Sequence, residues 1–281
     1  MEGTKDLEKI VALTLASAYI KGEKPASLMI VSDRPESGKT QLVNKYDGTD
    51  GIALLSDATA FALWRDYGKK IERNQLNHII IPEFLAPISR NKSTVNSFIA
   101  MLQMMMEEGL REIHTGFLKT AIEFNEPKVV GVITCLPAIS YMSNRLSWLV
   151  SGFLTRFIVV TYKYSQETII DIFNSILARE YLKENTLALR FPNEKTEIVI
   201  PKEIGIQCQD LALDVTKKER ASEKLYGFRE IKNILRLVSS NVILDNMEHD
   251  GDRTTVNQDD FDAINRISYL LNEEYNELRG R

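Results

Sequence analysis

The stretch Ala26-Ser-Leu-Met-Ile-Val-Ser-Asp-Arg-Pro-Glu-Ser-Gly-Lys-Thr40 decides how this chain folds. An apolar run comes first, a short loop follows, and Gly38-Lys39-Thr40 leads into a helical pattern that begins near Gln41. Strand, tight loop, Gly-Lys-Thr and helix is the order of a phosphate-binding P-loop, in which backbone N–H groups surround an anion. The stretch therefore predicts a site for a nucleoside triphosphate.

One position departs from the pattern G-x-x-x-x-G-K-[ST], because Asp33 stands where the first glycine belongs. Aspartate tolerates unusual backbone angles, but its carboxylate opposes a bound anion. Lys39 is expected to reach the β- and γ-phosphates of ATP, and the Thr40 hydroxyl to ligate Mg²⁺. A chance loop is the alternative. The residues expected to contact the nucleotide are Pro35, Glu36, Ser37, Gly38, Lys39, Thr40 and Gln41.

Length and composition narrow the class of protein. The 281 residues suit one large or two modest domains, and their 44% apolar and 26% charged content is that of an ordinary globular chain. No apolar run approaches the ~20 residues of a membrane span, and the N-terminus lacks the form of a signal peptide. Cys135 and Cys208 lie far apart and are expected to be inert thiols. We therefore expect a cytoplasmic protein that does not enter a membrane.

Charge is unevenly distributed along the chain. The net charge is −4, yet residues 1–163 hold 19 Lys and Arg against 17 Asp and Glu, while residues 164–281 hold 16 against 22. A surface that binds nucleic acid phosphates is therefore expected on the first part.

Short apolar runs alternate with helical patterns in the first part of the chain. A helix is expected over 5–20, another after the P-loop, one over 58–73 with Asp57 as its cap, and one from Ser93 or Thr94 to Glu108. Strands alternating with helices predict a doubly wound parallel sheet in an α/β fold. The expected strands are 27–32, 52–55, 78–81, 129–133 and 157–161, with a hairpin over 111–124.

The remainder of the chain has a different pattern. Residues 165–182 look helical, 187–191 and 196–200 suggest short strands, and 203–277 are mostly helical. The pattern predicts a P-loop ATPase core over 1–163 and a smaller, mainly helical lid domain over 164–281.

A P-loop ATPase needs a carboxylate at the end of a neighbouring strand, to hold Mg²⁺ and activate water. Here Ile79-Ile80-Ile81 leads to Pro82 and Glu83. Glu83 takes the place of the catalytic base and a Mg²⁺ ligand, while Pro82 replaces the aspartate that would organise the metal. Either Glu83 alone serves, or hydrolysis is slow or lost. The alternative is that Glu83 only begins an exposed loop.

Three further residues are candidates for the same site. Thr134 ends the fourth strand, where its hydroxyl could position water; otherwise it is an ordinary strand residue. Arg156 precedes the fifth strand at the rim of the sheet, from which a guanidinium can stabilise the transition state in a neighbouring subunit; otherwise it forms a surface ion pair. Arg229 opens a helix of the lid and would fold over the phosphates of its own chain; spacing alone makes it a solvated residue.

These parts, in this order, resemble an AAA+ ATPase. The segment Glu112–Phe124 resembles the pre-sensor-1 hairpin of the helicase-type clade that includes the MCM helicases. Leu154-Thr-Arg-Phe157 resembles the arginine finger of that family, and the segments 227–240 and 256–264 resemble its lid, in which Arg229 would be the sensor-2 arginine. Asp33 and Pro82 depart from the family pattern, and residues 57–74 are too few for the extra MCM hairpin. The resemblance implies a bare ATPase module, as a virus or mobile element could encode, in a bacterial, archaeal or viral-host cytoplasm.

The resemblance also implies partners. It implies a ring of identical subunits, a hexamer, that binds ATP and Mg²⁺, hydrolyses ATP and moves or remodels DNA during replication, with other replication or mobile-element proteins as further partners. Hairpin residues would then touch DNA phosphates. Two alternatives remain: a nucleotide-dependent switch or loader with weak or no hydrolysis, and a P-loop motor that acts on another polymer. The candidate DNA contacts are Arg111, His114 and Lys119.

Overall fold

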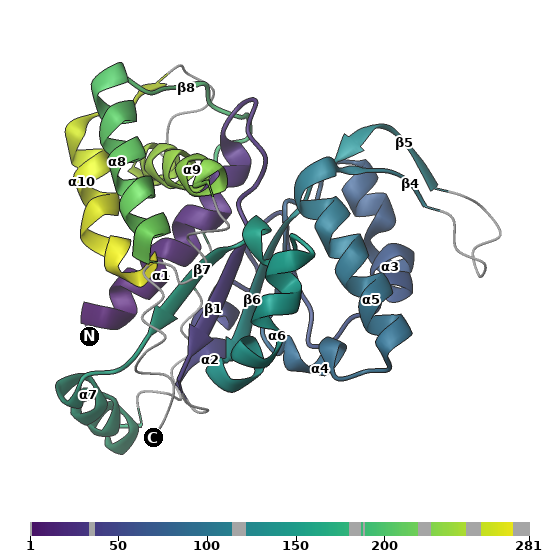
Figure 1. The fold of residues 1–281 in the computed structure, drawn as a ribbon, viewed down its shortest axis with the longest axis horizontal. Helices are drawn as coiled ribbons and strands as arrows, with labels where there is room; N and C mark the ends of the chain where they lie inside the picture. Colours follow the sequence, from purple (N-terminus) through teal and green to yellow (C-terminus); the bar gives the residue numbers. More distant parts are fainter. Residues whose placement is uncertain are drawn as a thin grey trace.

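A parallel sheet of five strands forms the centre of the molecule, as the apolar runs predict (Figure 1). The computed structural model describes residues 2–33, 37–113, 122–179, 187, 189–218, 226–245 and 254–271. All five expected strands are present, and β1 lies between β6 and β7. The predicted α/β fold is confirmed. In spatial order the strands are β2 (Ile52–Leu54), β3 (His78–Ile81), β6 (Gly131–Pro137), β1 (Leu28–Ser32) and β7 (Ile158–Tyr162).

The register of these strands separates the sheet into two edges. Leu28 pairs with Ile133 and with Ile158, and Ser32 pairs with Pro137 and with Tyr162. The carboxyl ends of the strands therefore meet at one edge, where α2 (Lys39–Asn44) begins (Figure 1). A five-residue strand rises about 13 Å between its first and last residues, so side chains that precede the strands lie far from those that follow them.

Helices cover both faces of the sheet, because successive strand residues are apolar on both sides. Ile30 packs into one hydrophobic cluster, and its neighbours Met29 and Val31 pack into another. The first cluster includes α2 and residues of α1 (Glu2–Ala16), α8 (Lys202–Lys218), α9 (Phe228–Asp245) and α10 (Gln258–Ile267). The second includes residues of α3 (Ala60–Glu72), α5 (Lys92–Gln103) and α6 (Ala138–Val150).

The helices after residue 200 pack together beside the β7 edge of the sheet (Figure 1). Asn257 and Asp260 form a capping box at the start of α10, and Asp260 also accepts a hydrogen bond from Asn241 of α9. The N-terminal helix α1 contacts α9, so the helical part of the molecule includes residues from both ends of the chain. The division of the chain at residue 163 stays a prediction.

Several elements differ from the expected ones. The cap of α3 is Thr59 rather than Asp57, and the cap of α5 is Asn91. The end of the helix expected up to Glu108 is a π-helical turn, Met104–Glu108, closed by Gly109 at φ 77°. No strand forms over 189–191. The remaining elements are α4 (Leu85–Ile88), α7 (Gln166–Leu177), the hairpin strands β4 (Leu110–Ile113) and β5 (Ile122–Lys128), and the pair β8 (Ile198–Val199) and β9 (Thr254–Thr255).

Helix α6 was not apparent from the sequence, because apolar residues occur on every side of it. Tyr141 and Trp148 are buried, whereas Ile139, Leu146 and Val150 are exposed. A helix that is apolar on its outer face lacks the usual alternation between core and solvent. Among the described residues, no helix combines the length and the apolar character that a membrane crossing requires.

A buried histidine fixes the start of β3. His78 is buried, and its Nε2 lies 3.1 Å from the carbonyl oxygen of Ala26. Gly131 makes this position possible, because a Cβ there would lie 2.4 Å from His78 Cδ2. Burial lowers the pKa of His78 to about 4, so the ring is neutral near pH 7.

The burial of His78 predicts that acid destabilises the protein. Its pKa falls from an ordinary 6.5 to about 4, so between these values the unfolded chain binds a proton that the folded chain does not. The contribution is fully retained above pH 6.5, and the free energy of unfolding then decreases by about 1.4 kcal/mol per pH unit down to pH 4. Urea unfolding at a series of pH values measures this slope. The His78→Gln variant should lack it; equal slopes in both proteins would contradict the assignment.

Candidate nucleotide-binding site

The P-loop lysine lies at the carboxyl edge of the sheet, as expected. Gly38 has φ 73°, a left-handed conformation that favours glycine, and Lys39 follows as the first residue of α2. The Lys39 ammonium donates to the hydroxyls of Ser37, at 2.9 Å, and Ser32. Burial lowers the pKa of Lys39 from its ordinary value. A partly desolvated ammonium that donates to neutral hydroxyls gains strongly from a phosphate anion.

Thr40 and Glu83 meet although 43 residues separate them. The Thr40 hydroxyl donates to Glu83 Oε1 at 2.7 Å, and the Glu83 side chain is exposed to solvent. A hydroxyl and a carboxylate are oxygen ligands of the kind that Mg²⁺ takes in proteins. The described residues contain no group of three or more His, Cys, Asp and Glu side chains that could hold a metal. An ion at this place would therefore complete its coordination with phosphate oxygens and water.

Thr134 is buried in the sheet and does not face the loop freely. Its hydroxyl donates to the carbonyl oxygen of Ile81 at 3.0 Å, across the pair of strands β3 and β6. The hydroxyl hydrogen is used in this bond, so Thr134 can accept a hydrogen bond from water but cannot donate one. Its role in orienting water stays a prediction.

Arg156 and Arg229 lie together at the amino edge of the sheet. The Gly152 carbonyl accepts hydrogen bonds from Arg156 Nη1, at 2.5 Å, and from Arg229 Nη1, at 3.5 Å. Arg229 also donates to the Thr155 hydroxyl. Arg156 Nη2 binds Glu108 Oε1 at 2.7 Å, and the side chain of Arg156 is only 11% exposed.

This placement corrects one expectation about the lid. Arg229 does not fold over the phosphates of its own chain, because it binds Thr155 and Gly152, which precede β7, whereas Lys39 follows β1. The length of a strand, about 13 Å or more, lies between the two groups. Arg156 and Arg229 therefore lie side by side at the amino edge, and neither of them reaches the P-loop of its own chain.

Acidic residues of the π-helical turn hold the basic side chains at this edge. Lys24 donates to the Glu107 carbonyl at 2.6 Å and lies 3.3 Å from its carboxylate. Burial alone would raise the pKa of Glu107, but Lys24, with Arg229 and Arg236 nearby, holds it below its ordinary value. The amino edge is therefore a network of paired charges.

Other candidates fall partly outside the described residues. Arg111 is exposed on β4, and Gln41 is exposed on α2. Pro35 and Glu36 of the loop, and His114 and Lys119 of the hairpin, lie outside the described residues. The grouping of Arg111, His114 and Lys119 as DNA contacts stays a prediction.

Two tyrosines that no sequence motif pointed to hold the P-loop. Tyr162 and Tyr164 each donate a hydrogen bond of 2.6 Å to the Ser37 carbonyl. In a trans peptide the carbonyl and the next N–H point in opposite directions, so this pair turns the Gly38 N–H away from β7. The signal was available in the spacing, because alternate residues at the end of a strand share one face.

The shared carbonyl predicts that the tyrosines substitute for each other. Tyr162→Phe or Tyr164→Phe alone should weaken ATP binding less than threefold, because one hydroxyl still holds Ser37. The double variant should lose about tenfold or more, since a buried carbonyl that loses every partner costs about 1–3 kcal/mol. Isothermal titration with ATP measures the affinities, and Tyr226→Phe, at an exposed position, is the control. Additive losses would indicate a packing role instead.

Comparison with known proteins gives the fold. No protein-family model matches the chain, and no curated protein matches it. Among solved structures, a full-length MCM homolog from Methanopyrus kandleri matches 97% of the chain with a TM-score of 0.52 and 12% sequence identity. The chain spans 56% of that protein's length. A structure of Hsp104 with ATPγS and FITC casein matches at a TM-score of 0.38 and 13% identity, over 97% of this chain and 44% of that one, too slight a likeness to support an argument. The likeness to the MCM homolog is one of fold, and it supports the AAA+-like α/β fold that the P-loop and the motifs after it predict.

Proposed function

We propose that this chain binds and hydrolyses ATP at the carboxyl edge of its sheet. The observation that carries the proposal is the bond between Thr40 and Glu83 beside the partly buried ammonium of Lys39. One site thereby combines the Lys39 cation for the phosphates, the Thr40 hydroxyl for the metal and the Glu83 carboxylate for the attacking water. Phosphoryl transfer needs these groups chiefly as positioned charges.

Each residue has a distinct task in this reaction. Lys39 exchanges the hydroxyls of Ser32 and Ser37 for phosphate oxygens. Glu83 accepts the Thr40 hydrogen bond on Oε1 and keeps further lone pairs with which to accept a proton from water. Pro82 offers no second carboxylate, so Thr40 and Glu83 are the protein ligands for Mg²⁺. When bound, the ion would neutralise charge that develops on the phosphates.

The proposed active site is shared between subunits. Arg156 and Arg229 lie at the amino edge, a strand length away from the loop of their own chain. An arginine that stabilises transferred phosphate must then come from another copy, with Arg156 exchanging Glu108 for that phosphate. A ring of subunits is the arrangement that uses both edges of every chain. The resemblance of the hairpin segment to that of helicases makes DNA the polymer on which we propose that the ring acts.

A second candidate function is a nucleotide-dependent switch with little turnover. Pro82 favours it, because one carboxylate organises the metal less well than two. Such a protein would change shape on binding ATP and recruit another factor.

ATP turnover measured over a range of protein concentrations, with and without single-stranded DNA, tests the main proposal. Turnover per subunit should rise with protein concentration, because the site needs two copies, and rise again with DNA. Stimulation by an unfolded protein instead of DNA would favour another polymer. Intact ATP binding with no turnover under any condition would favour the switch.

Replacing the base separates the two candidates more directly. Glu83→Gln keeps a side chain that can bond to Thr40 but cannot accept a proton, so turnover should fall 100-fold or more while ATP affinity changes little. Equal, near-zero turnover in wild type and variant, with ATP bound by both, would identify a switch.

Replacing the arginine tests the shared site. Arg156→Ala should bind ATP normally and lose turnover by roughly 10³-fold. Glu108→Gln is the matched control, because it removes the ion pair and keeps the arginine. Full ATPase activity in Arg156→Ala, or an equal loss in Glu108→Gln, would remove the assignment.

A further inference from the structure

Helix α7 leaves its apolar side uncovered. It follows β7, begins at the cap Ser165, and has no buried residue along its length. Ile170, Phe173 and Leu177 share one face at spacings of three and four, and each is more than half exposed, from 55% for Ile170 to 81% for Leu177. Figure 1 shows α7 standing apart from the sheet and from the other helices. An apolar stripe of this kind is typical of a surface that another structure covers.

Helix α6 carries a second uncovered stripe. Ile139, Leu146 and Val150 lie on its outer face at spacings of seven and four, and each is at least 63% exposed. Its inner face packs Tyr141 and Trp148 into the core. The stripes therefore lie on two different elements of one chain, and neither is covered by the other.

The two stripes adjoin the two separated parts of the proposed active site. The cap of α7 directly follows Tyr164, whose hydroxyl holds the Ser37 carbonyl of the P-loop. Helix α6 ends two residues before Gly152, whose carbonyl binds Arg156 and Arg229. A contact between α7 of one copy and α6 of another would therefore bring the loop of the first toward the arginines of the second.

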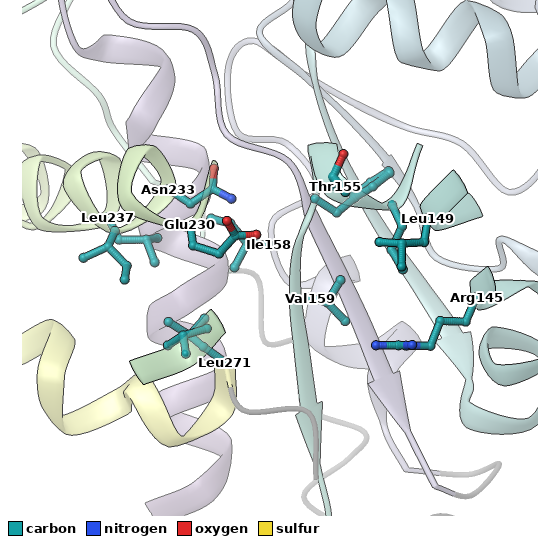
Figure 2. Close-up of a pocket in the computed structure, with 13 residues that line it drawn as sticks. Arg145, Leu149, Thr155, Ile158, Val159, Glu230, Asn233, Leu237 and Leu271 are labelled. Atoms are coloured by element: carbon teal, nitrogen blue, oxygen red, sulfur yellow. The ribbon is translucent and has the colours of Figure 1, made fainter. Parts of the chain in front are cut away.

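We propose that α7 of each subunit packs its stripe of Ile170, Phe173 and Leu177 on the α6 stripe of Ile139, Leu146 and Val150 of the next subunit. This inference rests on the proposed shared ATP site and assigns the surface that assembles it. The net charges of the two helices have opposite signs. The charged residues of α7 are Glu167 and Asp171, whereas the single charged residue of α6 is Arg145, which lines a pocket with Leu149 and Val159 beside the stripe-bearing face (Figure 2).

The contact joins two different surfaces, so it is heterologous. An open assembly therefore keeps one free α7 at one end and one free α6 at the other. Association continues until the rotation between subunits closes a ring. A contact between two copies of α7 would instead stop at a dimer.

Charge substitutions on the stripes test the interface itself. Phe173→Glu and Leu146→Glu place a carboxylate at exposed positions, where folding should persist, as far-ultraviolet circular dichroism can verify. Light scattering and sedimentation should show an assembly for the wild type and at least a tenfold weaker association for each variant. Ile206→Glu, at an exposed position of α8, is the control and should assemble normally. A wild type that stays monomeric with and without ATP would overturn the proposal, as would assembly in either stripe variant.

Mixing the two variants gives the decisive result. The Leu146→Glu chain retains its α7, and the Phe173→Glu chain retains its α6, so together they should form a dimer with one intact interface and no larger species. That dimer holds one complete ATP site. Adding Lys39→Ala to the Leu146→Glu chain should abolish its turnover, whereas adding it to the Phe173→Glu chain should not.

The outcomes of this mixture separate the interface from the chemistry. A dimer without turnover supports the interface and counts against the proposed ATPase activity. No dimer overturns the interface, whatever the activity of the wild type. Loss of turnover with the opposite placement of Lys39→Ala overturns the proposed direction of assembly.

Discussion

The parallel register of β1 between β6 and β7 is the constraint on which the rest of the structure depends. Because Ser32 pairs with Tyr162, the loop that follows β1 lies beside the two tyrosines at the carboxyl end of β7. Because Leu28 pairs with Ile158, the segment before β7 that holds Arg156 lies at the other edge. One hydrogen-bonding pattern therefore both supports the phosphate loop and keeps the arginines away from it.

Burial and hydrogen bonding give the two edges different properties. At the carboxyl edge, Lys39 is partly desolvated and bonded to hydroxyls, an arrangement that an anion can improve. At the amino edge, guanidinium groups already have carbonyl and carboxylate partners. A ligand gains little at the second edge unless it offers more negative charge than Glu108, and a triphosphate does.

The sequence predicted the elements whose signal is local. Each strand was a short apolar run, and Gly38-Lys39-Thr40 identified the loop without any knowledge of its surroundings. The meeting of Thr40 with Glu83 was also predictable, since residues after parallel strands share an edge. The sequence did not reveal that Tyr162 and Tyr164 bond to Ser37. Nor did it reveal that Arg156 and Arg229 share one carbonyl partner. They depend on which strands are neighbours and on how α9 packs, and no single segment carries that information.

The π-helical turn at Met104–Glu108 sets the direction in which the last side chains of its helix point. An α-helix advances about 100° per residue, and a π-turn accommodates one additional residue within the same length of helix. Without that residue, Glu107 and Glu108 would be rotated by about a quarter of a turn, away from Lys24 and Arg156. Removing one residue from this turn would therefore take the carboxylates away from the arginine edge without altering a single side chain.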